Sequence, residues 1–162
     1  MSKALLEGLA TSLVFLGTVV DADIERSRLV KARVHITTEG RAFCHHVSVT
    51  NNDPSRRVVV VLVGHLPGLR EEPKSVRVPT GWQSQIFRRE VRGVVKWAVQ
   101  CACVAPDSPP NAAVSKQGAK ACGLRTGDTV RFDVVLQYES ASLTTEPIYV
   151  RFSDGKTELA GK

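Results

Sequence analysis

The residues of this chain best suited to chemistry are its cysteines and histidines, four of each. Cys44 and His46 are two positions apart, so their side chains share one face wherever the chain is extended. Cys101 and Cys103 share a face for the same reason. Thiolate and imidazole groups are suitable ligands for zinc or copper. A structural zinc site usually separates two cysteines by roughly two to four residues, whereas only Ala102 lies between Cys101 and Cys103. We therefore predict no metal site and no cofactor. The alternative is a metal site, and its candidate ligands are Cys44, His46, Cys101 and Cys103.

Strand alternation also gives these side chains an expected environment. Cys101 and Cys103 fall on the same face as Trp97, which we expect to be the core side. A buried cysteine behaves as a small hydrophobic residue, and this interpretation needs no ligand. We expect His45 to pack in the core and His46 to face solvent.

The compartment is predicted from the amino end and the cysteines. An apolar segment follows Lys3 and runs from Ala4 to Val20, but Glu7 interrupts it, which favours a short amphipathic helix over a secretory signal. It is also shorter than the roughly 20 clean apolar residues of a membrane span. The sequence has no Asn-x-Ser/Thr sequon. We therefore expect reduced thiols, no membrane partner, and an intracellular (cytoplasmic) or virion location without secretion.

Motifs of the common enzyme classes are absent from the sequence. It has no Gly-x-Ser-x-Gly elbow, no phosphate-binding loop, no dinucleotide fingerprint and no His-Glu-x-x-His. We therefore predict a protein that is not an enzyme.

The charge is the remaining functional signal. The formal net charge is +6, and 14 of the 22 basic residues are arginine, whose planar guanidinium suits phosphate groups. The candidate contacts to RNA, to another polyanion or to neighbouring subunits are Arg26, Arg28, Lys31, Arg33, Arg56, Arg57, Arg88, Arg89, Arg92, Lys116 and Lys120. The alternative is that these are ordinary solvating charges, offset by 16 acidic residues.

The elements that must position these residues are β-strands. Apolar and polar side chains alternate in several stretches, and the clearest apolar set is Val30, Ala32, Val34 and Ile36. Residues 130–138 and 148–152 repeat this pattern. The run from Val58 to Val63 is apolar on both faces, which predicts a central strand covered on both sides.

We predict strands near residues 11–20, 28–37, 42–50, 56–64, 74–79, 84–91, 93–104, 129–139 and 146–152. This number of short strands indicates an all-β fold, a two-layer antiparallel β-sandwich of jelly-roll or immunoglobulin-like type. We expect one domain over residues 1–162, a short amino-terminal helix, and as an option a second short helix in the 105–128 loop.

Three functions are compatible with this sequence. The first is a self-associating structural subunit of viral coat (capsid) type that can contact RNA through surface arginines. The alternative is a monomeric or dimeric protein-binding module of immunoglobulin-like type, in which Trp82 is either an exposed anchor or a plug at one end of the sandwich. The third is a Cys/His metal-binding protein.

Overall fold

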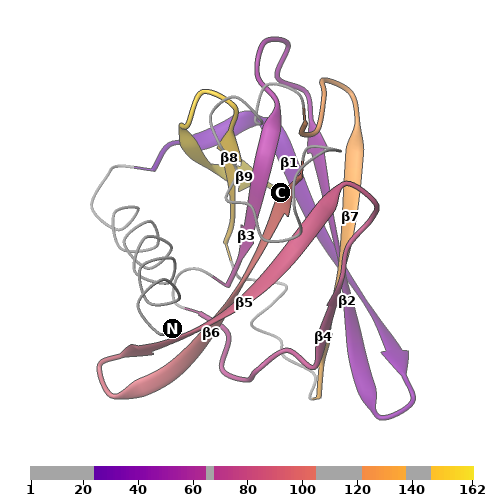
Figure 1. Ribbon diagram of the computed structural model, residues 1–162, viewed down its shortest axis with the longest axis vertical. Helices are drawn as coiled ribbons and strands as arrows, with labels where there is room; N and C mark the ends of the chain where they lie inside the picture. The colour runs from indigo at the N-terminus through magenta and orange to yellow at the C-terminus, as the bar shows by residue number, and fades with distance from the viewer. Residues whose placement is uncertain (1–23, 65–67, 105–121, 138–146) are drawn as a thin grey trace, which may run out of the picture.

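The computed structural model describes residues 24–64, 68–104, 122–137 and 147–162, and this part of the chain forms nine β-strands (Figure 1). They are β1 (Arg26–Glu39), β2 (Ala42–Asn51), β3 (Val58–Val63), β4 (Ser75–Arg77), β5 (Trp82–Val91), β6 (Val94–Cys103), β7 (Thr129–Leu136), β8 (Ile148–Phe152) and β9 (Thr157–Gly161). The described residues contain no α-helix, and none of their segments is a helix long and apolar enough to cross a membrane.

The strands form a single hydrogen-bonded order, β4-β7-β2-β1-β9-β8-β3-β6-β5, which folds over into two layers (Figure 1). One layer holds β4, β7, β2 and β1, and the other holds β9, β8, β3, β6 and β5. All neighbouring strands are antiparallel except β1 and β9, which pair in parallel where the layers meet. The prediction of a purely antiparallel sandwich is therefore wrong at this seam, because β9 lies between β8, its antiparallel neighbour in sequence, and the distant β1, with which it pairs in parallel.

The main core lies between the two layers, as the alternation predicts. Val130 and Phe132 of β7 are buried, while Arg131 between them is exposed. They pack in one cluster with Val61 and Val99 of the opposite layer. Two-residue periodicity places every second side chain of these strands in this apolar space.

Strand β3 is buried on both faces, which confirms the prediction from the valine run. Val61 and Val63 belong to the main core, whereas Val60 and Leu62 belong to a second cluster with Tyr149 of β8. All six residues of β3 are buried.

The predicted strands and loops can be compared with the structure within the described residues. Eight of the nine predicted strands correspond to β1–β8, with ends that differ by a few residues. The predicted strand at 11–20 and the amino-terminal helix lie outside the described residues. In the 105–128 loop, residues 122–128 form turns and an isolated bridge, and residues 105–121 lie outside the described part. The prediction missed β9.

The expectation of reduced thiols is wrong for two of the four cysteines. Cys103, the last residue of β6, forms a disulfide with Cys122, with Cα atoms 5.9 Å apart. Cys44 and Cys101 are free and buried. The strand alternation correctly predicted that Cys103 is buried. It could not predict the partner, because the pairing of Cys103 with Cys122 depends on how the two segments lie in space.

Candidate functional site

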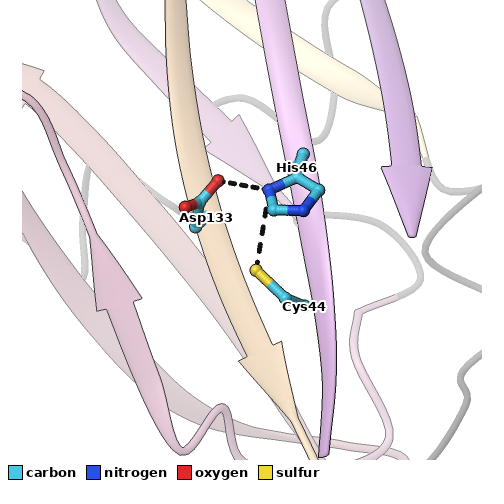
Figure 2. Close-up of side chains that lie close together, drawn as sticks. All are labelled: Cys44, His46 and Asp133. Carbon is cyan, nitrogen blue, oxygen red and sulfur yellow. Dashed lines mark hydrogen bonds and ion pairs between the residues drawn. The ribbon is translucent and has the colours of Figure 1, made fainter. Parts of the chain in front are cut away.

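A cluster of titratable side chains lies on the outer face of the β1-β2-β7 layer. Cys44 and His46 project from the same face of β2, two positions apart. Asp133 of β7 is the direct cross-strand partner of His46, and the antiparallel register brings them together although 87 residues separate them. Figure 2 shows the three side chains pointing toward one another.

The three side chains are close enough to act as one unit. His46 Nδ1 lies 2.6 Å from Asp133 Oδ1 and 3.6 Å from Cys44 Sγ. The other ring nitrogen, Nε2, lies 2.7 Å from Thr37 Oγ1 on β1. The Cys44 side chain is buried, and the side chains of His46 and Asp133 are 11% and 23% exposed. His46 is thus not the solvent-facing residue that the sequence predicted, because Asp133 and Thr37 lie on both sides of its ring.

Two arginines border this cluster. The guanidinium of Arg131 donates from Nε to Asp133 Oδ1 at 3.1 Å, and its Nη2 lies 2.5 Å from His46 Nδ1. Arg77 donates from Nη2 to Cys44 Sγ at 3.2 Å and to Glu39 Oε1 at 2.6 Å. Both arginine side chains are more than half exposed, at 57% and 51%. The cluster therefore joins two acceptors, the Cys44 sulfur and the Asp133 carboxylate, to two half-exposed arginines at the protein surface.

The protonation of the cluster follows from its surroundings. Burial raises the pKa of the Cys44 thiol, and the hydrogen bond from Arg77 opposes this effect without cancelling it. Burial also raises the pKa of Asp133, but hydrogen bonds with His46 and Arg131 outweigh it and hold that pKa below its usual value. At neutral pH the cluster thus combines a thiol with a carboxylate.

The three side chains do not have the arrangement of a Cys-His-Asp catalytic triad. A cysteine nucleophile needs a base on one ring nitrogen and an orienting carboxylate on the other. Here Cys44 and Asp133 both approach Nδ1, and Nε2 contacts Thr37. The arrangement suits the binding of a cation better than nucleophilic attack, because sulfur, nitrogen and oxygen donors converge on one point.

The structure separates the four ligand candidates of the sequence. It brings Cys44 and His46 together and adds Asp133, a residue that the search for cysteine and histidine spacing missed. Cys101 lies in the main core, where burial raises the pKa of its thiol to about 12. Cys103 is held in the disulfide. A ligand set that includes Cys101 and Cys103 is therefore wrong.

The structure places the predicted contact residues on several elements. Arg26, Arg28, Lys31 and Arg33 are exposed on β1, and Arg88 and Arg92 are exposed on the β5–β6 hairpin. Arg57 and Arg89 are half-buried, and Lys116 and Lys120 lie outside the described residues. Arg26 and Arg33 also line a cavity of about 450 Å³ at the seam of the two layers, beside Ile148 and Leu159.

Arg56 has a structural position, and its role as a contact residue stays a prediction. Its guanidinium lies 2.8 Å from Asp53 and 2.8 Å from Glu158, and it stacks 3.8 Å above the ring of Phe152. Arg56 thus ties the β2–β3 connection to β8 and β9. Its partners were not apparent from sequence because Glu158 lies 102 residues away.

The β5–β6 hairpin is a second candidate site, and its tip projects from the sandwich (Figure 1). Its ten register pairs run from Trp82 opposite Cys103 to Val91 opposite Val94. The turn between them, Arg92 and Gly93, has positive φ at both residues (51° and 75°), as a tight two-residue hairpin turn requires. Val91 and Val94 are 40% and 53% exposed, and among the described residues only Leu29 joins them as an exposed large hydrophobic side chain.

Strand β5 is also an edge of the sheet. No described strand pairs with its outer side, and it is ten residues long, whereas the opposite edge, β4, has three residues. Long open edges expose a row of backbone donors and acceptors to any extended segment. Trp82, by contrast, is not an exposed anchor, because its ring is half-buried and packs edge-on against Phe132 with centroids 5.1 Å apart.

Comparisons with known proteins support the fold and leave the function open. No protein-family model and no curated protein matches this sequence. The crystal structure of an uncharacterized protein from Nocardia farcinica, described as revealing an immunoglobulin-like fold, is 18% identical with a TM-score of 0.50, over 80% of this chain and 81% of that one. A cohesin module of a family 33 glycoside hydrolase from Clostridium perfringens is 12% identical with a TM-score of 0.48, over 83% of this chain and 92% of that one. The chain is thus an all-β sandwich of immunoglobulin-like fold, one of the two sandwich types predicted.

Proposed function

We propose that this protein is an immunoglobulin-like binding module that recognises a protein partner through its β5–β6 hairpin. The observation that carries the proposal is the ten-residue edge strand β5, whose outer side pairs with no described strand, together with the exposed Val91 at its end and the exposed Val94 across the turn. Natural sheets usually shorten or block such an edge, as the three-residue β4 does here. An edge that is left long and open suits an interaction in which a partner adds a strand.

The charge of the hairpin suggests the chemistry of the partner. Residues 82–103 carry four basic side chains and one acidic side chain, which are Arg88, Arg89, Arg92, Lys96 and Glu90. Opposite charge across an interface steers association and sets specificity. The proposed partner is therefore a protein with an extended, acidic segment that includes apolar residues to cover Val91 and Val94.

The Cys103–Cys122 disulfide supports a site of action where thiols are oxidised. This proposal replaces the intracellular location that the sequence suggested. The coat-subunit role, with self-assembly and RNA contact, remains a prediction.

The first test is the native mass of the purified protein by light scattering, with absorbance at 260 and 280 nm recorded across the same peak. A binding module gives a monomer or dimer without nucleic acid. A particle of megadalton mass that absorbs strongly at 260 nm would overturn the proposal in favour of the coat subunit.

The second test locates the contact surface. A photo-reactive amino acid replaces Val94 at the tip, and the same amino acid replaces the exposed Asp154 between β8 and β9 as a matched control. Any protein captured at position 94 and not at 154 is then purified, and its affinity is measured with the wild type. Equal capture at both positions argues against the hairpin.

A proline variant tests strand addition itself. In an antiparallel hairpin, hydrogen-bonded and non-hydrogen-bonded residue pairs alternate, and Val91 and Val94 beside the turn form a hydrogen-bonded pair. Arg88 and Trp97, three pairs further along, form a non-hydrogen-bonded pair. The backbone N–H and C=O of Arg88 therefore point away from β6, toward the outer side of the edge. Arg88→Pro removes an outward N–H and keeps the bonds to β6, so we expect it to weaken partner binding at least 10-fold relative to Arg88→Ala. Equal affinities for these two variants would argue against strand addition.

A further inference from the structure

We propose that Cys44, His46 and Asp133 form a zinc site with three protein ligands. Their donor atoms, Sγ, a ring nitrogen and a carboxylate oxygen, all lie within 4.8 Å of one another. The proposal is independent of the binding role of the hairpin, because the cluster lies on the outer face of the other layer.

The distance between the sulfur and the nitrogen donor closely matches a tetrahedral zinc site. With Zn–S near 2.3 Å and Zn–N near 2.0 Å, a tetrahedral ion holds sulfur and nitrogen about 3.5 Å apart. Cys44 Sγ and His46 Nδ1 are 3.6 Å apart. The same geometry needs about 3.3 Å between nitrogen and oxygen, and the 2.6 Å separation of His46 Nδ1 from Asp133 Oδ1 requires the carboxylate to move back by less than an ångström.

The surroundings of His46 fit the tautomer that binds a metal. A zinc-binding histidine usually donates its second ring N–H to a neighbour, which leaves the lone pair of the first nitrogen for the ion. Thr37 Oγ1, 2.7 Å from Nε2, is placed to accept that N–H. Nδ1 then presents its lone pair toward Cys44 and Asp133, the two residues that would complete the site.

The contacts at Nδ1 also point to a cation. Nδ1 lies 2.6 Å from a carboxylate oxygen and 2.5 Å from a guanidinium nitrogen of Arg131. The guanidinium of Arg131 is thus a cation held against both atoms, which shows that this position accommodates a positive charge.

The charges and the donor types select zinc. Zinc binding releases the proton of the Cys44 thiol to solvent, and the resulting thiolate and the Asp133 carboxylate together carry two negative charges, which a divalent ion neutralises. Calcium and magnesium prefer six or more oxygen ligands, whereas a sulfur, nitrogen and oxygen set suits zinc. Arg131 and Arg77 must leave the donors when the ion binds, and their half-exposed side chains can rotate into solvent. Three protein ligands leave the fourth zinc position to water or to another ligand.

The test is a titration of the purified, full-length, disulfide-intact protein with Zn²⁺ by calorimetry, and with Co²⁺ by absorption spectroscopy. We expect one ion per chain and a thiolate-to-cobalt charge-transfer band. Cys44→Ser should abolish that band, and both Cys44→Ser and Asp133→Asn should weaken Zn²⁺ binding more than 10-fold. His35→Gln is the matched control, because His35 is an exposed histidine on β1 whose ring lies 6.0 Å from that of His46, and it should bind like the wild type.

A gain-of-affinity variant keeps the test decisive if a ligand variant fails to fold. Arg131→Gln removes the guanidinium that competes for His46 and Asp133, so Zn²⁺ should bind at least several-fold more tightly. Absence of one-to-one binding by the wild type, a cobalt spectrum without a thiolate band, or weaker binding by Arg131→Gln would each overturn the site.

Discussion

Asp53 gives the sharpest test of how this fold is held at the β2–β3 corner. Its side chain is buried, and Oδ1 accepts hydrogen bonds at 2.9 Å from the backbone N–H and hydroxyl of Ser55 and from the backbone N–H of Arg56. Oδ2 accepts from Arg56 Nε at 2.9 Å and pairs with Nη2 at 2.8 Å. The perturbation is Asp53→Asn, which keeps the size and removes the charge.

The magnitude follows from the pKa of this carboxyl. Burial raises the pKa of Asp53, but the hydrogen bonds from Ser55 and Arg56 outweigh it and lower the pKa from 3.8 to about 2. That fall corresponds to at most about 2.4 kcal/mol of stability. Because Arg56, the charged partner of Asp53, is partly exposed, solvent screening reduces the expected contribution to about 1–2 kcal/mol.

The sign of the pH dependence is fixed by the lowered pKa. The ionised form is favoured in the folded state, so its stabilisation is present above the unfolded pKa of 3.8 and is lost as the pH falls through about 2. Asp53→Asn should therefore cost about 1–2 kcal/mol at pH 7 and less than about 0.5 kcal/mol at pH 2.

The assay is urea unfolding of both proteins at each pH, followed by the fluorescence of Trp82 and Trp97, which both pack against the core. Taking the difference between the wild type and Asp53→Asn removes the contribution of the other carboxyl groups. A cost that is the same at pH 7 and pH 2 would refute the electrostatic reasoning, and no cost at either pH would show that the corner does not depend on Asp53.

Three further predictions concern stability and are measured by the same unfolding assay at pH 7. Replacing both Cys103 and Cys122 by alanine should cost about 3 kcal/mol, because the disulfide closes a loop with a sequence separation of 19; an unchanged midpoint would contradict this. Phe132→Ala should cost about 3–5 kcal/mol, since the ring is fully buried between the layers, and a loss below about 1 kcal/mol would argue against that core. Gly123→Ala should cost more than about 1 kcal/mol, because φ is +105° and the new Cβ would lie 2.8 Å from a backbone oxygen; Gly127→Ala, with φ of +83° and open space, should cost less.

The alternation of apolar and polar residues predicted most of the strands, because successive side chains of a strand point to opposite faces of the sheet, one buried and one exposed. It failed at β9, where the pattern is reversed: Glu158 and Ala160 are buried and Leu159 is only half-buried. Glu158 can be buried because it pairs with Arg56, a residue far away in sequence. Strand order is likewise set by contacts between distant segments, so periodicity could not predict the parallel pairing of β1 and β9.

Only part of the candidate zinc site could be predicted from sequence, because its ligands come from two strands that are distant in the chain. Cys44 and His46 share a face of one strand, and that relation is written in their spacing. Asp133 belongs to the wet face of the strand predicted at 129–139, but only the register between β2 and β7 brings it opposite His46. The reading that grouped Cys44 with Cys101 failed because these residues lie on opposite sides of their layers, one in the outer cluster and one in the core.

The position of β9 between β1 and β8 sets a minimum time for completing this fold in the cell. Strand β1 ends at Glu39 and β9 begins at Thr157, so 118 residues must be synthesised before β1 meets its parallel partner. At roughly 5–20 residues per second, the ribosome needs about 6–24 s for this stretch. Throughout that interval one side of β1 lacks its final neighbour and exposes unpaired backbone donors and acceptors.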